Sequence, residues 1–365
     1  MRRLILLVAA LTFGYASAQD YVFGIVFDAG GKFDGSFNEG TWNGLDRSVN
    51  DIRSELGLEI DVLEFEGTPD TSAQGLRSIS EQGAELIVAP GFNQADSIAA
   101  VSAEFPFTSY VLIDAVVEAD NVRSVLFKEH EGGFLVGYLA GLMTRTGVVG
   151  FVGGMDIPLI RNFDLGYQQG VASACPDCRI ISNYVGTTPS AWNDPARARE
   201  LASSQRSQGA DIIYAAAGAS GNGVMDFVTE EQCFTPSGAV RDTPLQEVPV
   251  SAGYAAACGE NAHPLFFIGV DSNQNFMGDT DDDPSTLNHG LTSMLKRVDV
   301  AAEDAAWDIV HNEFTAGTQS LGLAENGVGW ALDAYNEALI PQSVINQLDG
   351  IRQAIVDGEI EVASY

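Results

Sequence analysis

Three aspartates and one glycine stand where apolar runs of the sequence end. Each run has the length and composition of a buried β-strand. The residues are Asp28 after 21–27, Asp114 at the end of 107–114, Gly218 at the end of 210–218 and Asp271 at the end of 264–271. Ligands of open parallel sheets bind outside the carboxyl ends of the strands. Carboxylates accept strong hydrogen bonds from neighbouring hydroxyl groups, so the pattern favours a site for a polyhydroxylated molecule over ordinary capping and turn roles.

Two aromatic residues lie in polar, turn-rich stretches. Phe37 is part of GSFNEG, and Trp192 is part of PSAWNDP. A flat heterocycle needs aromatic faces of this kind. We therefore expect Phe37 and Trp192 to contact a ligand, the alternative being that each packs beneath its own loop.

Other motifs carry less information. GASGNG at 218–223 resembles a phosphate-binding turn, but it is neither G-x-G-x-x-G nor a P-loop. The stretch from Asp271 resembles a calcium loop, yet Phe276 replaces the required glycine, so we reject that interpretation. The four histidines lie in unrelated contexts, and we find no nucleophile elbow or H-E-x-x-H. We expect no catalytic residue, metal or cofactor.

Strands and helices must alternate to place these residues. The expected strands are 21–27, 59–65, 84–90, 107–114, 149–154, 179–185, 210–218, 264–271 and 290–295, and the expected helices are 37–56, 72–82, 94–104, 132–144, 160–174, 195–208, 298–314 and 341–356. Such alternation predicts parallel sheets covered on both faces, an α/β fold. Asp34 precedes the first helix and is expected to cap it.

The composition excludes several classes of protein. The chain has 365 residues, 45% of them hydrophobic, and a net charge of −32. Such acidity makes the phosphate contribution to nucleic-acid binding repulsive, so no nucleic-acid partner is expected.

The N-terminus has the pattern of a signal peptide. Arg2 and Arg3 precede the apolar run 4–13, and Ala-Ser-Ala at 16–18 forms a cleavage site. We predict a signal peptide at 1–18, cleavage after Ala18 and export to the periplasm. A buried first helix is the alternative. No cysteine lies at the cut, so no membrane anchor is expected.

Four cysteines accompany this predicted export. Cys175 and Cys178 can close a local loop, and Cys233 and Cys258 can staple the aperiodic segment 231–263. An even number of cysteines in an exported chain is consistent with two disulfides. A redox or zinc role is disfavoured, because a strand follows Cys178 and the second pair lacks knuckle spacing.

The motifs together resemble one family. DAGGKFDGSFNEGTWNGL at 28–45, GADIIYAAAGASGNGV at 209–224, FIGVDSNQN at 267–275 and LTSMLKRVD at 291–299 are similar to the BMP/PnrA-like substrate-binding proteins of ABC transporters. The resemblance covers nearly the whole mature chain. It implies a type I periplasmic-binding-protein fold, in which two doubly wound parallel-sheet lobes are joined by a three-crossover hinge. We expect 19–145 plus roughly 275–315 in lobe 1, and 146–274 plus roughly 316–365 in lobe 2.

The resemblance also implies roles for individual residues. Asp28 and Asp114 would bind a base, Phe37 would stack on it, and Asn38 would support the opening loop. Gly218, Asp271 and Lys296 would hold a ribose, and Trp192 is the candidate for the second stacking residue.

The function implied is that of a non-enzymatic receptor. The protein would bind a nucleoside, purine more than pyrimidine, and deliver it to an ABC permease and ATPase, acting as a monomer. The alternatives are the same fold binding a sugar or another small heterocycle, a nucleoside-processing enzyme, and a sensor or adhesin without a transport partner.

Overall fold

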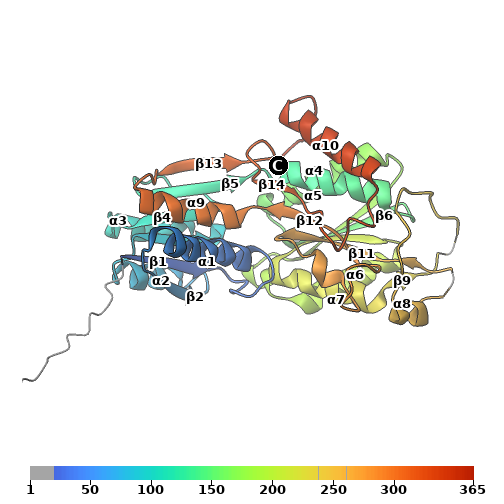
Figure 1. Cartoon of the computed structure of the whole chain (residues 1–365), viewed down its shortest axis with the longest axis horizontal. Coiled ribbons are helices and arrows are strands. Elements are labelled where there is room, and N and C mark those ends of the chain that lie inside the picture. Colours follow the sequence, from blue (N-terminus) through green and yellow to red (C-terminus); the bar gives the residue numbers. More distant parts are fainter. Residues whose placement is uncertain (1–19, 237, 260) are drawn as a thin grey trace, which may run out of the picture.

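The computed structural model describes residues 20–236, 238–259 and 261–365. Two six-stranded sheets lie side by side in it, each covered by helices (Figure 1). The predicted signal peptide lies outside the described residues. Within these residues no helix is both long and apolar enough to cross a membrane.

The first sheet contains six parallel strands in the order β13-β5-β4-β3-β1-β2. Its strands are β1 (Tyr21–Phe27), β2 (Ile60–Glu66), β3 (Leu86–Pro90), β4 (Ser109–Ile113), β5 (Val122–Phe127) and β13 (Gly317–Leu321). Its helices are α1 (Phe37–Leu56), α2 (Ser72–Ser80), α3 (Ala95–Glu104) and α9 (Val298–His311). Alternate strand residues are buried on opposite faces, since Ile25 belongs to the core beneath α1 and α9 and Val26 to the core beneath α2 and α3.

The second sheet has the order β14-β12-β11-β8-β6-β7, parallel except for the edge strand β14. Its strands are β6 (Val148–Met155), β7 (Arg179–Gly186), β8 (Ile212–Ala216), β11 (Phe266–Asp271), β12 (Gly290–Lys296) and β14 (Val328–Trp330). Its helices are α4 (Glu129–Met143), α5 (Pro158–Ala174), α6 (Pro195–Ser207), α7 (Asn222–Glu231) and α10 (Gln342–Val356). Helices α6 and α7 pack on one face, and α4 and α5 pack together on the other.

The described chain passes between the sheets three times. The first passage leads from β5 through α4 to β6, the second from β12 through α9 to β13, and the third from β13 to β14. The α/β class and the three-crossover arrangement of the two lobes are therefore confirmed.

Strand pairing differs from the expected lobe boundaries at two places. Lobe 1 is expected to include roughly 275–315, but β12 pairs with β11 in the second sheet. Lobe 2 is expected to include roughly 316–365, but β13 pairs with β5 in the first sheet. The reason is that the second passage begins after β12, so that α9, rather than β12, is the element that returns to the first lobe.

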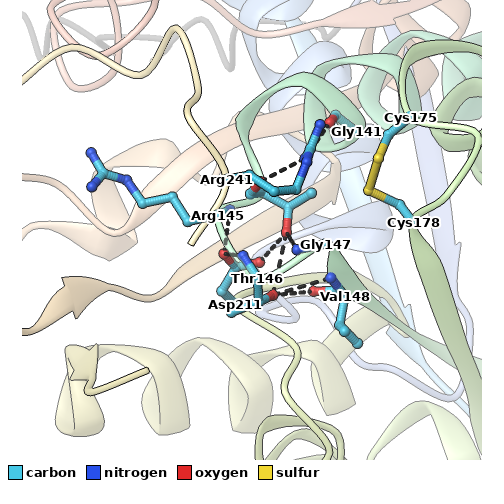
Figure 2. The surroundings of a disulfide bond; sticks show 10 residues. Gly141, Arg145, Thr146, Gly147, Val148, Cys175, Cys178, Asp211 and Arg241 are labelled. Carbon is cyan, nitrogen blue, oxygen red and sulfur yellow. Dashed lines mark hydrogen bonds between the residues drawn. A yellow bond between two sulfur atoms is a disulfide. The ribbon is translucent and has the colours of Figure 1, made fainter. Parts of the chain in front are cut away.

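Both cysteine pairs form disulfides, Cys175–Cys178 and Cys233–Cys258. The second pair staples a segment that contains β9 (Cys233–Phe234), α8 (Ala252–Ala257) and β10 (His263–Pro264). Figure 2 shows Arg241, from this segment, reaching the end of α4 near the Cys175–Cys178 bond. The Arg241 Nη1 donates to the carbonyl oxygens of Gly141 and Thr144, at 3.0 and 2.7 Å. Arg241 thus anchors the aperiodic segment to the C-terminus of α4, whose last carbonyl groups need such donors.

Candidate functional site

A pocket lies between the lobes, at the carboxyl ends of the strands. It encloses about 560 Å³ of space between protein atoms, its open mouth included. All eight residues predicted from the sequence lie in its wall. They are Asp28, Phe37, Asn38, Asp114, Trp192, Gly218, Asp271 and Lys296.

The opening loop is held by a network of hydrogen bonds around Asp34. As predicted, Asp34 caps α1, accepting from the backbone N–H groups of Ser36, Asn38 and Glu39. The Asn38 side chain donates to Asp34 Oδ2 and accepts from the N–H of Asp28, both at 2.9 Å. Asn38 therefore ties the end of β1 to the start of α1 and fixes Asp28 at the pocket.

Burial makes the pocket carboxyl groups of Asp28 and Asp271 easier to protonate than usual. Burial raises the pKa of Asp28 to about 6, and the hydrogen bond from the Ala29 N–H opposes this effect. Burial likewise raises the pKa of Asp271 to about 7, although the ammonium of Lys296 and the hydroxyl of Ser36 favour its ionised form. Each carboxyl can thus change its protonation state near neutral pH.

Lys296 forms the centre of a buried charge cluster. Its Nζ lies 2.6 Å from Asp114 Oδ1 and 3.1 Å from Glu129 Oε1, and its side chain is 2% exposed. Burial disfavours the ammonium, but Asp114, Glu129 and Asp271 outweigh burial and raise the pKa of Lys296. The ring of Phe37 lies 5.3 Å from Nζ, within the range of a cation–π contact. Lys296 is therefore charged and is positioned against the predicted stacking residue.

Trp192 belongs to the short 3₁₀ helix Pro189–Trp192 and is half-buried in the pocket wall. Its ring covers Gly154, where a Cβ would lie 2.2 Å from Trp192 Cζ3. Its backbone and ring also approach Gly218. Its Nε1 is buried and has no hydrogen-bond partner among the described residues, so it is a donor that a ligand could satisfy.

Hydrogen bonds join the lobes beside the pocket. The Ser36 Oγ donates to Asp271 Oδ2 at 2.8 Å, the Ser272 Oγ to the Ser36 carbonyl oxygen at 2.9 Å, and the Gln274 Nε2 to the Gly35 carbonyl oxygen at 2.9 Å. Residues on both sides of the cleft thus contact one another.

Sequence reasoning missed several residues of the site. Gly91, Phe92, Leu159, Ile160 and Phe163 also line the pocket. Glu129, which pairs with Lys296, was overlooked because β5 was not recognised as a strand and α4 was expected to begin at Gly132. Had β5 been identified, Glu129 would have been a further carboxylate near a strand end.

Comparison with known proteins assigns the chain to a family. Residues 22–242 match the family described as ABC transporter substrate-binding protein PnrA-like. The chain belongs to the PnrA-like family. The motif resemblance is thereby confirmed, and the PnrA-like chain is a substrate-binding protein of the ABC transporter type rather than a member of an enzyme family.

Relatives of the PnrA-like chain match over most of their length. The CD4+ T-cell-stimulating antigen of Listeria monocytogenes is 33% identical over 95% of this chain and 89% of its own. The ABC transporter nucleoside-binding protein BmpA of Lactococcus lactis is 27% identical over 93% and 88%. Among solved structures, an ABC transporter solute-binding protein of Aeropyrum pernix matches with a TM-score of 0.74 and 27% identity over 94% of each chain.

Proposed function

We propose that this protein is a periplasmic receptor that binds a purine nucleoside between its lobes and delivers it to the permease of an ABC importer. The observation that carries the proposal is that buried carboxylates, one buried ammonium and aromatic residues from both lobes line one interlobe pocket. A nucleoside combines a flat base with a sugar diol, and the two parts need different partners. The name of the Lactococcus lactis relative, a nucleoside-binding protein, supports this ligand class.

The sugar would be held at the Lys296 side of the pocket. Asp271 and Lys296 are buried there, and Gly218 belongs to the same pocket wall. A carboxylate can accept two hydroxyl protons, while an ammonium donates to hydroxyl oxygens. In a buried site, a ligand lacking these hydroxyl groups would leave charged groups unpaired, and this gives strong discrimination.

The base would lie between aromatic side chains near Asp28. Phe37 and Trp192 offer ring faces from opposite lobes, and Asp28 offers a carboxyl group at the end of β1. Stacking tolerates different bases, whereas hydrogen bonds to the base edge distinguish them. Asp28 and Asp114 are therefore the residues we assign to base recognition.

The test is a calorimetric titration of residues 19–365 after unfolding and refolding, which removes any carried ligand. Adenosine, guanosine, inosine, cytidine, adenine and ribose are added separately, and thermal shifts are recorded in parallel. We expect tight binding of the purine nucleosides, weak binding of adenine and ribose, and no product by chromatography. No response to any of the six from a folded protein would refute the nucleoside assignment and move the ligand to another class, such as a sugar. Release of free base would instead identify an enzyme.

Delivery to a permease needs a separate test. Deleting the gene should abolish the uptake of radiolabelled nucleoside by whole cells, and restoring it on a plasmid should recover uptake. A variant that binds no nucleoside should fail to restore uptake. Unchanged uptake in the deletion strain would contradict the transport role.

A further inference from the structure

We infer that Glu129 is a positioning residue that holds the Lys296 ammonium in the cleft whether the lobes are open or closed, while Asp114 pairs with it in the closed form. This inference rests on the proposed function only where it concerns nucleoside affinity. The evidence for the inference is the set of contacts that Lys296 makes. Asp114 follows β4 in the first sheet, Lys296 ends β12 in the second, and Glu129 is the first residue of α4.

Glu129 and Lys296 belong to one packed unit. Side chains two residues apart on a strand point to the same face, so Met294 and Lys296 both face α4. Residues three apart on a helix are neighbours in the same way, and Gly132 lies one turn after Glu129. A Cβ on Gly132 would lie 2.4 Å from Met294 Cε and 3.2 Å from Val328 Cβ. Helix α4 is therefore seated directly on β12 and β14 at the level of the charge cluster.

Asp114 belongs to the other unit. It lies at the end of β4, which pairs with β3 and β5 in the first sheet. Lobes of this kind move as bodies about the crossover segments. Opening would therefore separate Asp114 from Lys296 but leave the Glu129–Lys296 pair in place. Without Glu129, the open form would keep only Asp271 of the same lobe near Lys296, with no direct ion pair to hold the ammonium, and binding would have to order the lysine side chain.

The electrostatics of the cluster agree with an ion pair between Glu129 and Lys296. Glu129 is 1% exposed, and burial raises its pKa to about 7 against the attraction of Lys296. The charged and titratable groups that face the pair are Asp114, Asp271 and Tyr214, while His130 and Glu131 follow Glu129 on α4. A buried carboxylate is costly unless a cation pairs with it, and Lys296 is that cation for Glu129.

The chain offers a clean way to test the inference, because it has only three lysines, at positions 32, 128 and 296. Lys128 pairs with Glu131 at 3.3 Å on the surface and serves as the internal reference. The ligand-free protein is acetylated with an N-hydroxysuccinimide ester at pH 8, and the labelling rate at each lysine is measured by peptide mass spectrometry. The proteins compared are the wild type, Glu129→Gln, Glu129→Asp and the control Asp164→Asn, whose buried carboxyl lies in α5 away from the pocket wall.

We expect Glu129→Gln to raise the labelling rate of Lys296 relative to Lys128 by about tenfold or more, the factor that the loss of one charged hydrogen bond gives. Glu129→Asp should fall between the wild type and Glu129→Gln, and Asp164→Asn should match the wild type. Nucleoside affinity should fall in the same order. An unchanged Lys296 rate in Glu129→Gln, or an equal rise in Asp164→Asn, would overturn the inference. Labelling needs no ligand, so it decides the role of Glu129 even if the nucleoside assignment fails.

Discussion

Asp114 and Asp271 occupy equivalent positions in the two lobes. Each stands at the carboxyl end of the third strand in its sheet, counted from β13 in one and from β14 in the other. Both adopt the left-handed backbone conformation, with φ of 73° and 63°. Few residues other than glycine do so, and aspartate and asparagine are among those that tolerate it. The two lobes thus present a strained carboxylate to the same pocket, and such strain is concentrated at functional sites.

Replacing Asp271 separates its backbone role from its binding role. We expect Asp271→Ala to abolish measurable nucleoside binding, and to lower the free energy of unfolding by about 1–2 kcal/mol because alanine is unfavourable at this φ. Asp271→Asn should weaken binding as well, yet avoid that backbone penalty. Calorimetry and urea denaturation measure the two effects. Unchanged affinity in both variants would remove Asp271 from the ribose site.

The raised pKa of Asp271 predicts how stability depends on pH. The carboxyl binds its proton more tightly in the folded protein, at about 7, than in the unfolded chain, at 3.8. Its contribution to stability is therefore fully present below about pH 4 and is lost as the pH rises toward 7. The stability of the wild type relative to Asp271→Asn should fall over this interval and level off above it. Urea denaturation of the ligand-free proteins from pH 4 to 8 tests this, and a relative stability that rises with pH would contradict it.

Phe37 is predicted to stack on the base. We expect Phe37→Ala to weaken nucleoside binding by ~1–3 kcal/mol, the usual range for a base stacked on an aromatic ring. Phe33→Ala is the matched control, because Phe33 lies in the loop just before α1 but is 79% exposed and outside the pocket wall. Equal affinities for the two variants, measured by calorimetry, would make Phe37 a packing residue.

Gly154 provides an indirect test of Trp192. A methyl group at Gly154 would overlap the indole ring, so Gly154→Ala should displace Trp192. We expect a loss of affinity similar to that of Trp192→Ala, again ~1–3 kcal/mol, with a shift in tryptophan fluorescence. In the control Gly350→Ala the new methyl group meets no atom within 4 Å, and affinity should not change. Full affinity in both Gly154→Ala and Trp192→Ala would show that Trp192 packs beneath its loop.

The Cys233–Cys258 disulfide should affect stability without affecting binding. It closes a loop across a sequence separation of 25 residues, and both cysteines lie outside the pocket wall. We expect the Cys233→Ser/Cys258→Ser double variant to lose about 2–4 kcal/mol of unfolding free energy, the typical worth of such a bond. Nucleoside affinity measured well below the unfolding temperature should be unchanged. A large loss of affinity would show that the segment stapled by this disulfide contributes to the binding site.

The sequence by itself determined the elements whose signals are local. The limits predicted for α1, Phe37–Leu56, are those observed, because its apolar spacing and the capping Asp34 lie within one stretch of chain. The strand-end residues Asp28, Asp114 and Asp271 were found in the same way, since parallel strands must bring their carboxyl ends to one edge.

Only the tertiary structure decided which strand joins which sheet. Strand β5 escaped prediction because Arg123 and Ser124 interrupt its apolar pattern, and Arg123 is buried there by pairing with Asp308 of α9, at 2.7 Å. Strand β13 is polar and mostly exposed, so hydrophobic periodicity gives no sign of it. Strand pairing depends on partners distant in the chain, and so does the pairing of Glu129 with Lys296. The local pattern therefore located the strand-end residues of the site, while the pairing of Glu129 with Lys296 followed from the packing of α4 on β12.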